Sequence, residues 1–156
     1  MDKETIATDQ ISRVIHSKEG DQLARKFQIK IDDSVFFAFL MEDKSPKTCK
    51  AFLSLLPLEG KILHATWSGE MLFLKCNGIT GRQELENATV YPSRGDVGLN
   101  FNLGELQIVY GQAQLRARLG PAPDSIFARI TENPDRLEEM GQKIHREGAK
   151  NIVIKM

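Results

Sequence analysis

The run HATWSGEMLFL, residues 64–74, concentrates an aromatic ring, a hydroxyl and a carboxylate at one bend. These groups belong to Trp67, which is the single tryptophan of the chain, and to Ser68 and Glu70. Ligand sites favour such a combination, because the ring packs on the ligand while the polar groups fix its orientation. In the alternative interpretation, Gly69 takes a positive φ in a tight bend and the indole fills one end of the core. The sequence supports both interpretations equally.

Two tyrosines and one histidine extend this candidate site. Tyr110 is in phase with Leu106 and Ile108, which favours a core position. Tyr91 precedes a proline at a strand end, where it could line the same opening. His64 is interpreted as a wall histidine with satisfied hydrogen bonds rather than as a general base. The predicted ligand-binding residues are therefore Trp67, Ser68, Glu70, Tyr91, Tyr110 and His64.

Outside these candidate residues the sequence contains no complete catalytic or metal-binding motif. There is no Ser-His-Asp order, no paired-carboxylate signature and no Cys-His spacing of a zinc site. The runs GITG, residues 78–81, and GDVG, residues 95–98, precede no helix, so neither predicts a phosphate-binding loop. Cys49 is typical of a small buried hydrophobe, and His145 of a solvated charge at a helix C-terminus. We expect no metal and no cofactor, and the sequence leaves open whether the protein is an enzyme.

The composition describes one soluble domain. The 156 residues suffice for a single core, and 21 basic residues balance 21 acidic ones, so nucleic acid is not an expected partner. Two cysteines are too few for a disulfide framework. No run approaches the ~20 apolar residues of a membrane-spanning helix, and the polar start MDKETIATDQ lacks a signal-peptide core. We expect a cytoplasmic protein without a membrane partner.

The first residues differ from the rest of the chain. Residues 1–22 carry few large apolar side chains, although Asp9 could cap a short helix that presents Ile11 and Val14 on one side. We interpret residues 1–22 as an arm that either frays or docks on a second subunit, so a homo-oligomer is possible. Residues 23–156 are the predicted folded domain.

Alternating apolar and polar residues predict eight strands. Residues 26–31, KFQIKI, alternate strictly, as a half-buried strand does. Residues 35–41, VFFAFLM, return after a turn as a strand that is apolar on both faces. Residues 76–88 are the longest loop, and residues 112–123 show no clear periodicity. The other strands are predicted within residues 61–67, 70–75, 90–101, 102–111, 125–130 and 149–156.

Two amphipathic helices interrupt the strands. The first opens at Pro46 with Ser45 as its N-cap and ends before Pro57. The second opens after Asn133 as its cap and closes at Gly148. A sheet of eight antiparallel strands in one small domain is best closed into a barrel, which removes its edges. The predicted fold is therefore mainly β, a closed eight-stranded barrel with two α-helices that cap its ends.

Several segments resemble the cyclophilins. SPKTCKAFLSLL, residues 45–56, is similar to their first helix, and SIFARITENPDRLEEM, residues 125–140, to their strand–helix segment. The resemblance covers about residues 26–156 and implies the cyclophilin barrel. LLPLEGKILHATWSGE, TVYPSRGDV and IVYG resemble more closely a set of small bacterial cyclophilin-like proteins of unassigned function.

The isomerase chemistry of the cyclophilins does not follow from this resemblance. Their strand after the first helix carries a Phe-His-Arg, whose guanidinium polarises the prolyl amide, and the matching residues here are Leu63, His64 and Ala65. The glutamine and the apolar floor of the proline pocket are not recognisable in residues 70–76. Loss of such an electrophilic donor removes ~3 kcal/mol of transition-state stabilisation. The resemblance thus implies the scaffold without prolyl isomerase activity.

We therefore predict an uncharacterised cyclophilin-like protein that binds a small molecule or a short peptide in the barrel opening. A second hypothesis is an interaction or assembly module. Related barrels occur, by resemblance, in bacterial proteins of cyclic-amide and urea metabolism, so an accessory subunit of a small-amide-metabolising enzyme is a third. Residual prolyl isomerase activity is less favoured. An open pocket with polar walls would favour the ligand hypothesis, and a sealed barrel with an apolar outer patch the interaction module.

Overall fold

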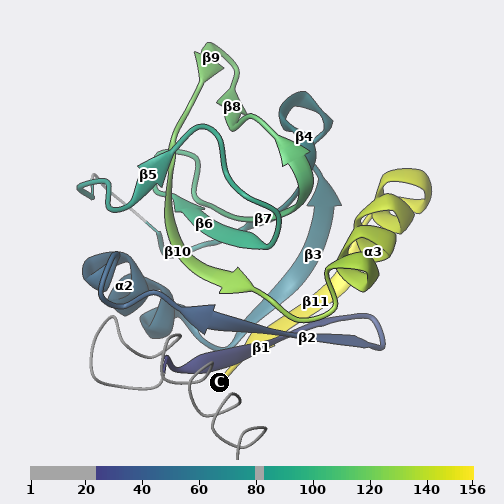
Figure 1. Ribbon diagram of the computed structural model, residues 1–156, viewed down its shortest axis with the longest axis horizontal. Coiled ribbons are helices and arrows are strands. Elements are labelled where there is room, and N and C mark those ends of the chain that lie inside the picture. The colour runs from purple at the N-terminus through teal and green to yellow at the C-terminus, as the bar shows by residue number, and fades with distance from the viewer. Residues whose placement is uncertain (1–23, 80–82) are drawn as a thin grey trace, which may run out of the picture.

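The computed structural model describes residues 24–79 and 83–156, and its main feature is a closed barrel (Figure 1). Eight strands form this barrel: β1 (Lys26–Ile31), β2 (Ser34–Leu40), β3 (Leu58–His64), β4 (Gly69–Lys75), β6 (Asp96–Asn100), β7 (Glu105–Ala113), β10 (Asp124–Ile130) and β11 (Lys150–Lys155). They pair in the order β2-β1-β11-β3-β4-β7-β6-β10, and β10 pairs back with β2. Every pairing is antiparallel. The predicted mainly β fold, a closed eight-stranded barrel with two helices, is confirmed.

Shorter elements are attached to the barrel. Strand β5 (Ala88–Thr89) adds to the edge of β10, and β8 (Arg116–Ala117) pairs with β9 (Gly120–Pro121) in a separate hairpin. A 3-10 helix, η1 (Thr66–Ser68), joins β3 to β4. Within the described part of the chain, no helix is both long and apolar enough to cross a membrane. The predicted N-terminal arm, residues 1–22, lies outside the described residues.

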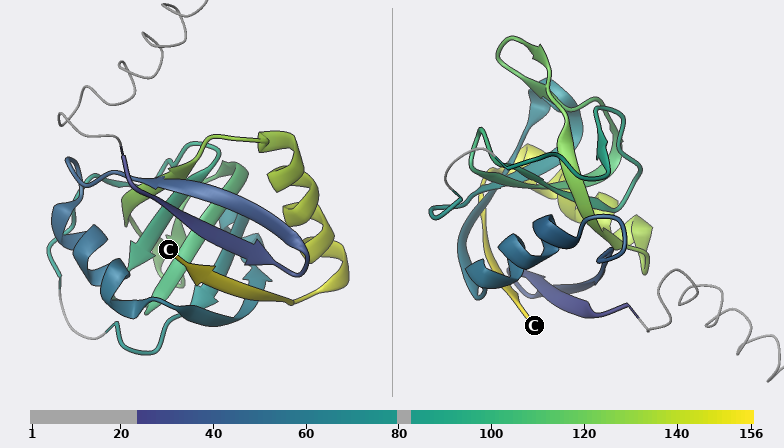
Figure 2. Two further views of the ribbon diagram at one scale, coloured as in Figure 1. Left: turned by 90° about the horizontal axis from the view of Figure 1, so that it is seen from below. Right: turned by 90° about the vertical axis from the view of Figure 1, so that its left-hand side faces the viewer.

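The two helices lie at opposite ends of the barrel, as the left view of Figure 2 shows. Helix α2 (Pro46–Leu55) buries Cys49 and Phe52 against the core, so the predicted apolar stripe points inward. Helix α3 (Pro134–Glu147) buries Leu137, Met140 and Ile144 on one face, which is the face that its 3.6-residue periodicity predicts.

An aromatic cluster ties α2 to the barrel interior. The ring centroid of Phe52 lies 4.6 Å from that of Phe27 on β1 and 4.6 Å from that of Phe127 on β10. All three side chains are buried, with Phe52 and Phe127 at 0% exposure. Because the three phenylalanines lie far apart in the sequence, this cluster forms only when the barrel has closed.

Part of the outward-facing side of β4, β7, β6 and β10 is also buried. We call this surface the outer face. Its apolar half contains Met71, Val109 and Ile126, packed with Ala65 and Leu115 in a second apolar cluster. Its polar half contains Glu105, Gln107, Asn100 and Asp124. The segments around β5 and β8 lie over this face, since Leu115 and Ile126 donate their backbone N–H groups to the carbonyls of Val90 and Asn87.

Several local expectations are wrong in their details. Strand β3 ends at His64, so the predicted strand 61–67 is shorter at its C-terminal end and Trp67 lies on η1. Neither predicted N-cap forms a side-chain cap: the Ser45 hydroxyl donates instead to the Ile126 carbonyl at 2.7 Å, and Asn133 has a left-handed φ of 52°. The unassigned residues 112–123 complete β7 and form the β8–β9 hairpin.

Candidate functional site

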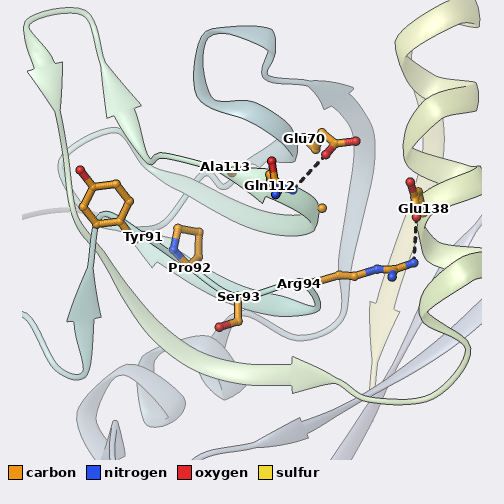
Figure 3. Close-up of a pocket in the computed structure, with 9 residues that line it drawn as sticks. Glu70, Tyr91, Pro92, Ser93, Arg94, Gln112, Ala113 and Glu138 are labelled. Atoms are coloured by element: carbon orange, nitrogen blue, oxygen red, sulfur yellow. Dashed lines mark hydrogen bonds and ion pairs between the residues drawn. The ribbon is translucent and has the colours of Figure 1, made fainter.

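A groove of about 670 Å³ opens between β4, β7, the turn before β6 and helix α3 (Figure 3). Its walls mix charged, amide and apolar side chains. The lining residues are Glu70, Tyr91, Pro92, Ser93, Arg94, Gly111, Gln112, Ala113 and Glu138. They come from four separate stretches of sequence, and barrel closure together with the docking of α3 brings them to one place.

The Glu70 carboxylate is held between β7 and α3. Its Oε1 accepts the backbone N–H of Gln112 at 3.0 Å, and its Oε2 accepts the side-chain amide of Gln142 at 3.1 Å. Gly111 permits this approach, because a Cβ at that position would lie 2.5 Å from Glu70 Oε1. The carboxylate thus has a fixed position at the groove wall.

Arg94 crosses the groove toward α3, as Figure 3 shows. Its Nη2 lies 3.1 Å from Asp135 Oδ1 and 2.9 Å from Glu138 Oε2. The following Gly95 has a φ of +92°, and a Cβ there would lie 2.2 Å from the Ile130 carbonyl oxygen, so this turn requires glycine. The described residues that line the groove include two carboxylates and one guanidinium, and Asp135 adds a third carboxylate at its edge.

Tyr91 and Pro92 provide an apolar end to the groove. The Tyr91 side chain is 70% exposed, and its hydroxyl accepts the amide of Gln114 at 3.2 Å. The Tyr91 backbone N–H donates to Thr89 Oγ1 at 2.9 Å, which fixes the turn that carries the ring. An exposed ring held in this way offers a flat surface on which another ring can stack.

A second group of titratable side chains lies at the end of β3, outside the groove. His64 Nε2 lies 2.6 Å from the Tyr110 hydroxyl, and Nδ1 lies 2.9 Å from Thr66 Oγ1. Burial raises the pKa of Tyr110 to about 12, with Glu70 and Glu138 adding to the shift. The phenol therefore keeps its proton, and the tautomer of the His64 ring sets the direction of both hydrogen bonds.

The His64 ring stacks on that of His145 from α3, with centroids 4.2 Å apart and planes inclined by 16°. Burial lowers the pKa of His64 below its ordinary value, and the charge of His145 lowers it further. His145, predicted as a solvated charge, is exposed but also makes this ring contact. A lowered histidine pKa means that the folded state favours neutral His64, so its stabilising contribution is present above pH 6.5 and is lost as the pH falls through the lowered value.

Replacing His145 with glutamine is expected to raise the pKa of His64 toward its ordinary value, because the repelling charge is removed. NMR titration of the His64 ring signals measures this directly. Arg146→Gln, which removes a charge from the same helical turn without touching the stacked rings, is the matched control. An unchanged His64 pKa in His145→Gln would contradict the electrostatic coupling.

The structure separates the six predicted site residues into three places. Glu70 and Tyr91 line the groove, whereas His64 and Tyr110 contact each other at the end of β3. The other two predicted residues lie on η1.

Trp67 is 52% exposed and packs on Phe73, with ring centroids 5.3 Å apart, so it does not fill the core. Ser68 is buried, and its Oγ accepts the backbone N–H of Arg116 at 3.1 Å, which ties η1 to β8.

The sequence interpretation included only Glu70 and Tyr91 among the lining residues, and the charged or amide side chains that it missed are Arg94, Gln112 and Glu138. In the sequence Arg94 resembles a plain exposed charge, because its acidic partners lie more than 40 positions later in the chain. The one available signal is the i, i+3 spacing of Asp135 and Glu138, which places two carboxylates on one helix face. Asp96, which lies beside this turn, has a structural role: it accepts the Ser93 N–H at 2.7 Å and pairs with Arg129 at 2.7 Å.

Comparison with known proteins places the chain in a family but gives no activity. The model of the family described as "Protein of unknown function (DUF3830)" matches residues 28–156. None of the curated proteins compared with the chain matches it.

Two solved structures share the fold. The structure of McbB in complex with tryptophan has a TM-score of 0.70 at 18% identity, covering 83% of this chain and 44% of McbB. The solution structure of the hypothetical protein AF2241 from Archaeoglobus fulgidus has a TM-score of 0.61 at 18% identity, covering 87% of this chain and 98% of AF2241. The chain therefore spans less than half the length of McbB.

Proposed function

Since the chain belongs to the DUF3830 family of proteins of unknown function, we propose from the geometry of its groove that it binds a small molecule there. The proposed ligand carries an amine, a carboxylate and a flat ring, as an aromatic amino acid does. The observation that carries this proposal is the placement of Glu70, Arg94 and Tyr91 along one groove (Figure 3).

The charges of the groove support a ligand with both an amine and a carboxylate. Glu70 is fixed by two amide donors, which are neutral, so its negative charge remains available to an ammonium group. Arg94 already contacts Asp135 and Glu138, and its guanidinium has further N–H donors for a carboxylate. Tyr91 adds the ring on which an aromatic side chain would stack.

The fold comparison supports the same ligand class. McbB, whose barrel resembles this one at a TM-score of 0.70, was solved with tryptophan bound. An aromatic amino acid is therefore a reasonable first probe for this chain. A dipeptide with both termini free and an aromatic side chain offers the same groups and is the second probe.

We also infer that the barrel is of the cyclophilin type but lacks prolyl isomerase activity. The position that matches the catalytic arginine of that family is Ala65, a buried side chain with 0% exposure in the second apolar cluster. A methyl group cannot donate a hydrogen bond to a prolyl amide. A protease-coupled peptide assay that shows cyclophilin-like acceleration would overturn this inference.

Isothermal titration with a matched set of ligands tests the groove. We expect L-tryptophan to bind, and both tryptamine and indole-3-propionate to bind more weakly, because each lacks one of the two charged groups. Glu70→Gln and Arg94→Gln are each expected to weaken binding of L-tryptophan by about 10–100-fold, the usual range for a lost charge-assisted hydrogen bond. Thermal unfolding of each variant checks that it remains folded.

Arg25→Gln is the control for these variants. Arg25 pairs with Glu42 at the surface and does not line the groove, so its replacement should leave the affinity unchanged. If none of the three ligands binds, the proposal is overturned. It is also overturned if Glu70→Gln binds L-tryptophan with the same affinity as the natural protein.

A second candidate function is self-association as an interaction module. Leu63 and Trp67 are 38% and 52% exposed, and both are next to Phe73, which pairs with Leu63 across β3 and β4. This apolar patch would be covered by a second copy of the chain. Light scattering tests this candidate: a dimer that dissociates in Trp67→Ser supports it, whereas a monomer at high concentration excludes it.

A further inference from the structure

Two buried oxygen atoms on the outer face have no hydrogen-bond partner. They are Oε1 of Gln107 on β7 and Oδ2 of Asp124 on β10. Their residues are 3% and 1% exposed, so bulk water does not reach them. Each buried acceptor left without a donor destabilises the fold, because it has lost its hydrogen bonds to water and gained none in return. Two such acceptors on one face therefore indicate a donor that belongs between them.

The strand pairing places both side chains beside Gly98. Gln107 pairs directly with Gly98 across β6 and β7, so the two residues share a face and their Cβ positions would be about 5 Å apart. A Cβ on Gly98 would lie 3.2 Å from Asp124 Oδ2. Because Gly98 has no side chain, Asp124 and Ile126 take up the space beside it, and Gln107 lies across the strand pair from it.

The remaining hydrogen bonds fix which atoms face this space. Asp124 Oδ1 accepts the amide of Asn100 at 3.0 Å, so Oδ2 is the free oxygen. The Gln107 amide nitrogen donates to Glu105 Oε2 at 3.0 Å. A flipped Gln107 amide would turn its oxygen toward the Glu105 carboxylate, which would be repulsive. The amide oxygen of Gln107 must therefore point away from Glu105.

We propose that Asp124 is a neutral carboxylic acid in the folded protein and donates its proton from Oδ2 to Oε1 of Gln107. One bound proton then satisfies both unpartnered oxygens. It also completes a chain of contacts from Lys75 through Glu105, Gln107, Asp124 and Asn100 to the backbone N–H of Leu103. The outer face is thus a proton-binding site whose occupancy stabilises the barrel.

The surrounding charges agree with a neutral Asp124. Burial raises its pKa to about 7, and Glu105 raises it while the hydrogen bond from Asn100 opposes the shift. From β4, the charge near this cluster is Lys75, which pairs with Glu105 at 2.9 Å. The β5 residue that pairs with Asp124 is the uncharged Thr89. Farther along β6 and β10, Asp96 is paired with Arg129. In the described part of the chain, no ion pair involves Asp124 itself.

The raised pKa gives a defined pH dependence. Between the ordinary aspartate value of 3.8 and about 7, the folded protein keeps this proton and the unfolded chain does not. Stability therefore falls as the pH rises through this window and levels off above it. One proton changes the unfolding equilibrium constant by up to about tenfold per pH unit, so Asp124 contributes a change of about 100-fold between pH 5 and pH 8, and the smaller effect of His64 acts in the opposite direction.

Asp124→Asn tests the proposal because its amide can donate permanently to Gln107 Oε1. We expect this variant to lose the 100-fold pH dependence and to be at least as stable as the natural protein at pH 8. The matched control is Asp135→Asn, which removes a carboxylate with 94% side-chain exposure and should leave the pH dependence intact. Urea unfolding at pH 5 and pH 8 provides the measurement.

Infrared spectroscopy of the natural protein gives a second, independent measurement. The expected result is a protonated carboxyl band at pH 5 in the difference between the spectra of the natural protein and Asp124→Asn, and its loss on raising the pH. An ionised Asp124 at pH 5 would overturn the proposal, and so would an unchanged pH dependence of stability in Asp124→Asn. Either result would assign the donor role to a buried water or a cation. If Asp124→Asn fails to fold, the titration of the Asp124 carboxyl carbon in the natural protein, followed by NMR, decides between the same two outcomes.

Discussion

Replacing Gly141 with alanine is expected to destabilise the protein by about 1–3 kcal/mol, the usual cost of overpacking a core. The same change in an exposed helix interior would stabilise it by about 0.5–1 kcal/mol. The reversal arises because a Cβ on Gly141 would lie 2.3 Å from the ring of Tyr110, a buried side chain. Helix α3 would have to move away from β7, and the urea midpoint measures the loss.

Two controls separate this clash from a general effect on α3. Glu139→Ala changes an exposed residue of the same helix and should leave stability nearly unchanged. The single substitution Tyr110→Leu destabilises the protein, but it also removes the ring that the new methyl group of Gly141→Ala would contact. The double variant should therefore be more stable than the sum of the two single effects predicts. Strict additivity would contradict the proposed contact.

Replacing Phe52 with alanine should cost about 3–5 kcal/mol, the range for a large side chain removed from a packed core. Phe52 is 0% exposed and contacts both Phe27 and Phe127, so its loss leaves a cavity where α2, β1 and β10 meet. We expect α2 to lose its anchor as well as its core contact. Chemical unfolding measures the change in free energy.

Leu119→Ala is the control for the cavity variant. Leu119 has 100% exposure in the β8–β9 hairpin, so its truncation should change stability by less than about 0.5 kcal/mol. A small effect of Phe52→Ala, comparable with that of Leu119→Ala, would show that the aromatic cluster is not the centre of the core.

The elements of the barrel were predictable because they depend on local periodicity. Strand β1 alternates in sequence as it alternates in burial, with Phe27, Ile29 and Ile31 inside. Proline at the first position and glycine after the last position marked α3 correctly, since both signals act within one turn. Closure into a barrel followed from the need to remove sheet edges.

Local signals failed where a distant group competes for the same atom. Ser45 has the side chain of a good N-cap, but its hydroxyl donates to the Ile126 carbonyl, 81 residues away. Trp67 continues the apolar alternation of β3, yet the chain turns into η1 before Gly69, whose φ is +107°. No window of neighbouring residues contains this information.

The groove could be predicted only in part for the same reason. Glu70 and Tyr91 stood out by residue type at strand ends, whereas Arg94 and Glu138 become neighbours only after α3 docks. The outer-face cluster was not anticipated at all, because Gly98, Gln107 and Asp124 come together through strand register. Register is a property of the closed sheet rather than of any single strand.

The position of β11 has a consequence for synthesis of the chain on the ribosome. Strand β11 lies between β1 and β3, although it is the last strand in sequence, and it pairs with both of them. Until residues 150–155 leave the exit tunnel, β1 and β3 each present a free edge, with Ile29 and Ile31 on a strand that lacks its neighbour. Such edges are templates for pairing with other chains. The nascent protein therefore keeps two aggregation-prone strand edges even after translation of this strand, until residues 150–155 have left the tunnel.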